Sequence, residues 1–269
     1  MTMHRWWQTP FMMASLAAHL FAALLVLVRA DLWPWALGAV LLDHLAMCVG
    51  GLWPRSTLLG PNLVRLPEDA ALRREVAITI DDGPDPDVTP QVLAILSSRG
   101  AHATFFCIGE RAAAHPDLCR AIVAAGHAVE NHGQRHRHHS AFFGPRAWLR
   151  EVAAAQATLE AITDRRPAYF RAVAGLRNPF LEPVLSSLGL RLATWTRRGY
   201  DTRTRDPERV LHRLTRCLLP GDILLLHDGH CSRTSAGRPV ILEVLPRLLD
   251  EIAARKLTPV TLGSVCKPT

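Results

Sequence analysis

Two adjacent carboxylates, Asp81 and Asp82, end an apolar run in ITIDDGPDP, and two histidines, His132 and His136, follow another apolar run in ENHGQRH. Neighbouring carboxylates repel each other, and a bound cation would offset that repulsion. Histidines four positions apart present both imidazoles on one side of a helical turn, which suits two ligands of one metal. Two imidazoles and one carboxylate leave positions open for water, which is typical of a catalytic zinc site.

The histidines alone are weak evidence, because His127, His138 and His139 lie close by and a His-rich loop is more often solvated surface. The surrounding elements strengthen the interpretation. From residue 75 onward, short apolar runs alternate with longer helical patterns, which predicts a parallel sheet with crossover helices. The predicted strands are Val76–Ile80, Ala103–Cys107, Ala128–Glu130, Ala168–Phe170, Arg191–Trp195, Ile223–Leu226 and Pro259–Thr261. The predicted helices include Pro90–Ser98, Pro116–Ala125, Arg146–Ile162, Pro207–Leu219 and Pro239–Ala254.

Ionisable residues gather at the carboxyl ends of these predicted strands. In barrels and in doubly wound sheets alike, that edge carries the active site. A chain that kept such residues only for solubility would scatter them. The residues at this edge are Asp81, Asp82, His132, Arg171, Asp201 and His227.

Four segments, ITIDDGPDP, NHGQRH, FRAVAG and LLLHDG, resemble in order and spacing the signature motifs of the polysaccharide deacetylase family. This family is also called the NodB-homology or carbohydrate esterase 4 family. The resemblance covers about residues 75–265. It implies an α/β fold, a distorted (β/α)7 barrel close to the TIM barrel. It also implies metal-dependent removal of an N-acyl group, such as acetyl, from an amino sugar in a polysaccharide or cell-envelope glycan.

The resemblance assigns a role to each matching residue. The implied ligands of a divalent metal, zinc above all, are Asp82, His132 and His136. The implied base, the residue that positions it, the acid and the carboxylate that tunes the acid are Asp81, Arg171, His227 and Asp201. The apolar lining of the acyl pocket and an oxyanion N–H are expected at Leu225 and Ala174. By contrast, His230 is predicted to be surface, and Asp206 to cap the helix that begins at Pro207.

The chain departs from the family pattern at three positions. Val173 stands where the family has Pro, Thr202 where it has Trp, and Arg198 where it has Asp. These positions shape the substrate groove, so the departures concern polymer binding rather than the metal ligands or the acid–base pair.

The first 54 residues differ from the rest. Phe11–Val28 and Leu32–Trp53 are each close to the roughly 20 apolar residues that a membrane-spanning helix needs. Five tryptophans flank these two segments, as at membrane–water interfaces. A cleaved signal peptide is the alternative, but VRAD is a poor cleavage site and a second apolar segment follows at once. The sequence predicts two transmembrane helices in 1–54, a linker in 55–74 and a catalytic domain in 75–269.

Asp43 and His44 would be costly within a span, so they are expected to face a partner helix or each other. Arg5 precedes the first segment, and Arg55 and Arg65 follow the second. By the positive-inside rule, this distribution predicts a multi-pass protein of the bacterial inner membrane with its catalytic domain on the cytoplasmic face.

The formal net charge is +7, from 31 basic and 24 acidic residues. The basic residues are spread out and no basic run is interleaved with aromatics, so no nucleic-acid partner is expected. The expected partners are the membrane and either an N-acylated glycan or a lipid-linked amino sugar. The second substrate would make the protein a deacylase or deformylase of lipid-linked sugars. An inactive, membrane-anchored glycan-binding protein is a further alternative, but every implied catalytic residue is present.

Overall fold

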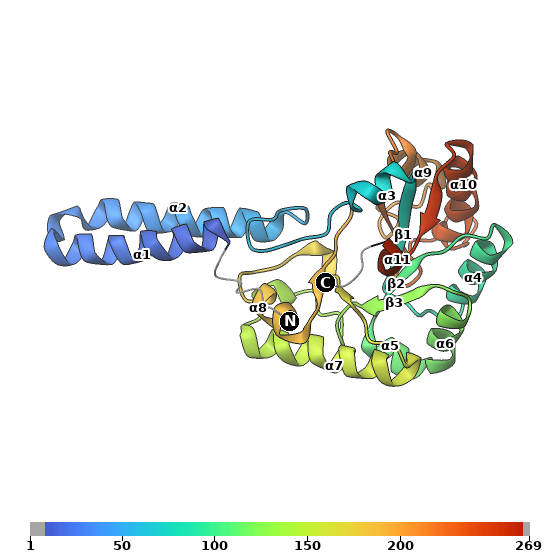
Figure 1. The fold of residues 1–269 in the computed structure, drawn as a ribbon, viewed down its shortest axis with the longest axis horizontal. Helices are drawn as coiled ribbons and strands as arrows, with labels where there is room; N and C mark the ends of the chain where they lie inside the picture. Colours follow the sequence, from blue (N-terminus) through green and yellow to red (C-terminus); the bar gives the residue numbers. More distant parts are fainter. Residues whose placement is uncertain (1–8, 266–269) are drawn as a thin grey trace.

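The computed structural model describes residues 9–265, and Arg5, Trp6 and Trp7 lie outside this range. A hairpin of two long helices, α1 (Pro10–Val28) and α2 (Trp33–Leu52), projects from a rounded α/β domain (Figure 1). The short 3-10 helix η2 (Ala30–Leu32) joins them. Both helices are long and apolar enough to cross a membrane. They expose large apolar side chains over their length, among them Leu20, Leu24 and Leu41.

The domain is built on one curled sheet of parallel strands. The strands are β1 (Glu75–Asp81), β2 (Thr104–Cys107), β3 (Ala128–Asn131), β4 (Tyr169–Phe170), β5 (Arg191–Leu192), β6 (Arg197–Arg198), β7 (Ile223–His227) and β8 (Thr258–Val260). Their order is β5-β4-β3-β2-β1-β7-β6, and β8 pairs with β1. This architecture confirms the predicted distorted (β/α)7 barrel.

The curl of the sheet follows from its connectivity. β5 and β6 lie at opposite edges, yet only the four residues 193–196 separate them in sequence. Four residues span at most about 14 Å, so the two edges must approach each other. The N–H of Ala193 donates to Phe170 on one side of the gap, and the N–H of Thr196 donates to Ile223 on the other. The single strand predicted at Arg191–Trp195 is therefore wrong, because this segment passes from one edge to the other.

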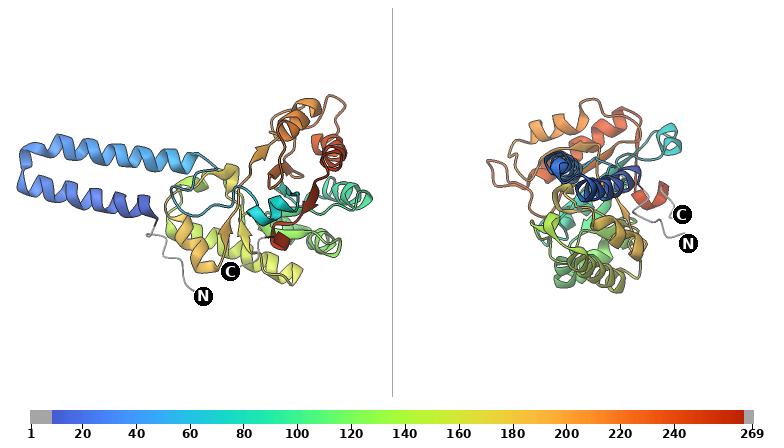
Figure 2. Two further views of the ribbon diagram at one scale, coloured as in Figure 1. Left: turned by 45° about the horizontal axis from the view of Figure 1, so that its top comes forward. Right: turned by 90° about the vertical axis from the view of Figure 1, so that its left-hand side faces the viewer.

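Helices cover the outside of the sheet (Figures 1 and 2). They are α4 (Thr89–Ser98), α5 (Gly109–Ala114), α6 (Pro116–Ala124), α7 (Pro145–Thr163), α8 (Leu181–Leu188), α9 (Pro207–Thr215) and α10 (Val240–Ala254). The short helices α3 (Glu68–Leu72) and α11 (Leu262–Val265) instead contribute Ala70 and Leu262 to the inner core cluster. Successive side chains of β1 point to opposite faces of the sheet, so the hydrophobic core is divided into two clusters. Ile78 and Ile80 pack in the outer cluster with the helices, whereas Ala77 packs in a separate inner cluster with Phe106 and Leu225. This alternation puts Thr79 and Asp81 on the inner face.

The end of the helical hairpin packs directly on the barrel. Gly51, near the end of α2, accepts a hydrogen bond from the N–H of Arg177, which lies in the loop after β4. The guanidinium of Arg177 is buried and donates to the carbonyls of Ser56 and Gly60. A Cβ on Gly51 would lie 2.3 Å from the Arg177 carbonyl oxygen, so only glycine permits this approach. The segment between the hairpin and β1 packs on the barrel as well, since Leu63 pairs with Ala193.

This contact predicts opposite effects for the same substitution at two glycines of α2. Gly51→Ala should lower the thermal stability of the detergent-solubilised chain, because overpacking against backbone costs about 1–3 kcal/mol. Gly38→Ala should be neutral or stabilising by up to about 1 kcal/mol, since a Cβ there meets nothing within 4 Å. Thermal unfolding followed by circular dichroism would compare them. Equal melting temperatures would mean that the hairpin does not pack on the barrel in this way.

Candidate active site

The carboxyl end of β1 presents the two adjacent carboxylates. Asp82 has a φ of 72°, in the left-handed region, so the chain turns directly after the strand. Gly83 then passes so close to Asp228 that a Cβ would lie 2.5 Å from its Oδ1. Asp81 stays on the inner face of the sheet, and Asp82 is turned toward the loop after β3. The two neighbours thus face different surroundings.

Asp82, His132 and His136 come together as one group. Asp82 Oδ1 lies 3.1 Å from His132 Nε2 and 2.9 Å from His136 Nε2. The ligand atoms of all three residues lie within 4.8 Å of one another. His132 is buried at the end of β3, and His136 is half-buried one turn later in the following loop.

The protonation of this group fits a cation. The Nδ1 of His132 lies 2.8 Å from the carbonyl oxygen of Arg171, which can only accept, so Nδ1 carries the proton and Nε2 presents a lone pair. Asp82 Oδ1 is buried and has no hydrogen-bond donor within the described residues. Burial alone would raise the pKa of Asp82. The three nearby imidazoles of His132, His136 and His230 lower this pKa by a larger amount, so the carboxylate stays ionised. These donors fit a divalent metal.

Asp81 is held by a guanidinium that is entirely buried. Arg171 Nη1 donates to Asp81 Oδ1 and to Thr79 Oγ1, both at 2.7 Å. Its other nitrogens donate to the carbonyls of Ala193 and Thr194, and its Cζ lies 4.0 Å from the centre of the Phe106 ring. Because each guanidinium nitrogen of Arg171 donates to a fixed acceptor, Arg171 orients the Asp81 carboxylate. The Oδ2 of Asp81 is left without a guanidinium partner.

His227 ends β7, beside Asp81 in the parallel register. Asp201 is fully buried and contacts His227 twice: Oδ2 accepts the backbone N–H at 2.7 Å, and Oδ1 lies 2.9 Å from Nδ1. Burial lowers the pKa of His227, but Asp201, followed by Asp81 and Asp82, raises it more, to about 9. The imidazole is therefore protonated at neutral pH.

The two remaining predicted residues border the same region. Leu225 lies two positions before His227 in β7, on the same face, and is buried in the inner cluster. Ala174, in the 3-10 helix η4 (Val173–Gly175), has a φ of 54°. Within residues 9–265, no group accepts a hydrogen bond from its N–H.

Two residues near Asp82, His132 and His136 were not predicted. His230, expected to be surface, is half-exposed, but its Nδ1 lies 3.2 Å from Asp82 Oδ2 and its ring stacks on His136. Arg111 Nη1 donates to the carbonyl of Asp82, and Nη2 lies 2.9 Å from His230 Nε2. The available signal for His230 was the motif HDGH, in which His230 follows His227 by three positions.

Asp206 caps α9 as predicted, accepting from the N–H of Glu208.

Arg198, where the resemblance implies Asp, carries a cation without an ion-pair partner among the described residues. Its Nε is buried without a hydrogen bond. Its guanidinium lies 5.2 Å from the centre of the Trp195 ring and 5.0 Å from that of Tyr200. Trp195 also lies 5.8 Å from the guanidinium of Arg171. The departure from the family pattern therefore places positive charge close to the site.

Residues 69–193 match the sequence model of the polysaccharide deacetylase family. A chitooligosaccharide deacetylase of Bradyrhizobium is 33% identical over 60% of this chain and 74% of its own length. The chain belongs to the polysaccharide deacetylase family. A peptidoglycan N-acetylglucosamine deacetylase of Bacillus cereus is 31% identical over 64% of this chain and 81% of its own.

The family's barrel is also found in a protein described as a pseudoenzyme. That protein of Bacillus anthracis has a TM-score of 0.67 and 20% identity, over 76% of this chain and 68% of its own. The fold alone therefore does not decide whether a polysaccharide deacetylase is active. The residues at the carboxyl edge of the sheet carry that argument.

The charge on His227 depends on Asp201, which gives a direct prediction. In Asp201→Asn, the pKa of His227 should fall well below 9, because the largest raising influence is lost while burial still lowers the pKa. The imidazole would then lose its proton at a lower pH than in the unmodified chain. NMR titration of the ring in chelator-treated protein would measure the shift, with His227→Gln to assign the signal. An unchanged pKa would show that Asp201 does not stabilise the imidazolium.

Proposed function

We propose that this chain is a metal-dependent hydrolase that removes an N-acetyl group from an amino sugar of a polysaccharide or cell-envelope glycan. One observation carries the proposal: a group of two imidazoles and a carboxylate suited to an open metal site lies at the same edge of the sheet as a positioned carboxylate, Asp81, and a protonated imidazole, His227. Amide hydrolysis requires a base for the attacking water and an acid for the departing amine, both within reach of an electrophilic centre. The deacetylase relatives support the same reaction.

Asp82, His132 and His136 would hold the metal, and two nitrogen donors with one carboxylate favour zinc. A bound divalent ion would lower the pKa of water and polarise the amide carbonyl. Asp81, oriented by Arg171, accepts a proton from the attacking water. His227 donates a proton to the departing amine, and Asp201 keeps it charged for this step. The N–H of Ala174 faces the developing oxyanion, and Leu225 packs on the acyl methyl.

Two neighbouring substitutions separate the proposed roles. Asp82→Asn should lose the metal held with His132 and His136, and activity with it, because a neutral amide is a poor ligand. Asp81→Asn should keep the metal and lose activity by about 100-fold or more, in the range of a general base. Metal content by mass spectrometry and acetate release from chito-oligomers would test this. Full activity of Asp81→Asn would refute its role as base, and the exposed Asp117→Asn serves as control.

A second candidate, a deacylase or deformylase of a lipid-linked amino sugar, is favoured by the position of the hairpin. The end of α2 packs on the loop after β4 that also carries Ala174. Pro54 touches this loop too, since a Cβ on Gly175 would lie 2.6 Å from the Pro54 Cβ. With the hairpin inserted in the bacterial inner membrane, the active edge would lie close to the bilayer. The Arg distribution supports insertion with the domain on the cytoplasmic face.

Unpaired positive charge near the site also favours a phosphate-linked substrate. A cavity of about 560 Å³ is lined by Arg135 and Arg137, on either side of His136 in the sequence, and by Arg150. Arg137 and Arg150 form no ion pair within the described residues. Together with Arg198, they provide cations for a diphosphate or phosphate between sugar and lipid.

A parallel assay would decide between the two substrate classes. The full chain in lipid nanodiscs should deacylate a polyprenyl-phosphate-linked N-acyl amino sugar faster than peptidoglycan or chito-oligomers. Arg198→Ala should raise KM for the lipid-linked substrate about 10-fold and leave chito-oligomer turnover unchanged, because only the former carries phosphate. A preference for the polymers would instead assign the protein to glycan deacetylation.

A further inference from the structure

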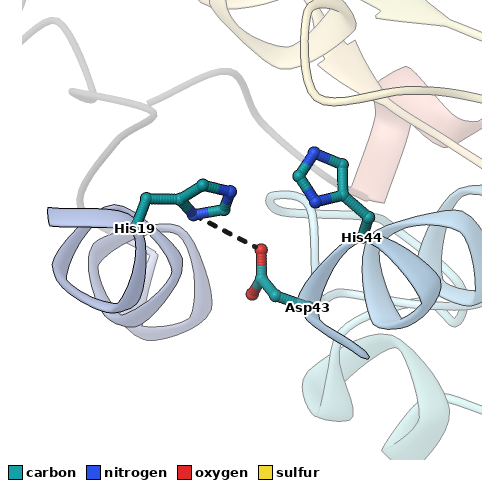
Figure 3. Close-up of side chains that lie close together, drawn as sticks. All are labelled: His19, Asp43 and His44. Carbon is teal, nitrogen blue, oxygen red and sulfur yellow. Dashed lines mark ion pairs between the residues drawn. The ribbon is translucent and has the colours of Figure 1, made fainter. Parts of the chain in front are cut away.

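The helical hairpin contains a second group of metal-binding side chains. His19 in α1 and Asp43 and His44 in α2 offer ligand atoms that all lie within 4.8 Å of one another. Figure 3 shows the two imidazoles, one from each helix, directed toward each other beside the carboxylate of Asp43. The three residues lie near the middle of two helices that are otherwise almost entirely apolar. The proposed deacetylase reaction gives this group no role.

Both imidazoles are oriented by their own helices. His19 Nδ1 lies 2.8 Å from the Ser15 carbonyl, and His44 Nδ1 lies 2.8 Å from the Val40 carbonyl. A carbonyl oxygen only accepts, so each Nδ1 carries a proton, and in the neutral imidazole each Nε2 keeps its lone pair for a metal. Metal-ligating histidines are typically held in this way, with the second nitrogen bonded to a carbonyl or carboxylate. The ring centres are 5.2 Å apart.

Asp43 lacks a compensating charge. Its Oδ2 accepts a hydrogen bond from Ser15 Oγ at 2.8 Å and lies 3.8 Å from His19 Nδ1, whose proton is already donated to a carbonyl. Arg29, the one arginine in residues 9–53, is paired with Asp31. A carboxylate between apolar helices is costly when its charge is not offset. A cation bound by both lone pairs and this carboxylate would offset it.

We propose that the hairpin binds a divalent transition metal, of the zinc class, through His19, Asp43 and His44. Imidazole nitrogens disfavour magnesium and calcium, which take oxygen ligands. The ion would join α1 to α2 across the 23 residues of sequence between His19 and Asp43, and so hold the hairpin together. This site is separate from the Asp82 group, and its role is structural rather than catalytic.

Metal stoichiometry of the full chain in detergent tests the proposal. After loading with Zn²⁺ and dialysis, the unmodified protein should retain two equivalents. Asp82→Asn should retain one, His44→Ala should retain one, and the combined variant none. One equivalent in the unmodified protein, lost entirely in Asp82→Asn, would refute the hairpin site. Two equivalents in His44→Ala would refute it as well.

Matched controls separate metal binding from helix packing. Ser15→Ala removes the hydrogen bond to Asp43 but no proposed ligand, so it should keep the second equivalent. His212→Ala removes an exposed histidine of α9 and should also keep it. Co²⁺ bound to Asp82→Asn should show absorption bands of a nitrogen- and oxygen-liganded ion, and adding His19→Ala should remove them. Circular dichroism verifies that each variant is folded.

An assay of deacetylase activity distinguishes the proposed hairpin metal site from the proposed enzyme function. His44→Ala should retain deacetylase activity, because His44 is far from the barrel in sequence and lies within α2. Loss of the second metal equivalent with retained activity is the expected result. Failure of the Asp82 and Asp81 variants to behave as proposed would leave the hairpin stoichiometry unaffected.

Discussion

The buried guanidinium of Arg171 connects the parts on which the site depends. It donates to Thr79 and Asp81 on β1 and to Ala193 and Thr194 in the segment that closes the curl. Its own carbonyl accepts from His132, so the same residue orients one proposed metal ligand and the proposed base. Burial lowers the pKa of Arg171, and this cost is offset only while all these acceptors are in place. The positions of the proposed metal ligand His132 and of the proposed base Asp81 therefore both depend on closure of the sheet.

Much of this arrangement could be predicted from local patterns. Apolar runs ending in Asp81, His132 and His227 located the strand ends, and parallel topology then brings these ends to one edge. Asp206 followed by Pro207 was enough to predict the start of α9. These features depend on residues close together in the chain, where periodicity and capping act directly.

Features that depend on the curl could not be predicted in the same way. The split of Arg191–Trp195 into β5 and β6 follows from the need to bridge two sheet edges, which no local pattern encodes. His230 reaches Asp82 only because β1 and β7 pair and Arg111 approaches from α5. The tight contact of Gly51 with Arg177 likewise joins residues far apart in sequence. Long-range packing, rather than residue type, determines these three features.

The contact between α2 and the loop after β4 has a consequence for how the molecule meets its substrate. Gly51 is hydrogen-bonded to Arg177 and the following segment packs on the barrel, so the hairpin is joined to the domain by packed contacts rather than by a free linker. The end of the hairpin lies directly beside the loop after β4, which carries Ala174. Whatever anchors the hairpin thus sets the distance at which the proposed active edge works, so the proposed choice of sugars would depend on reach as well as on chemical recognition.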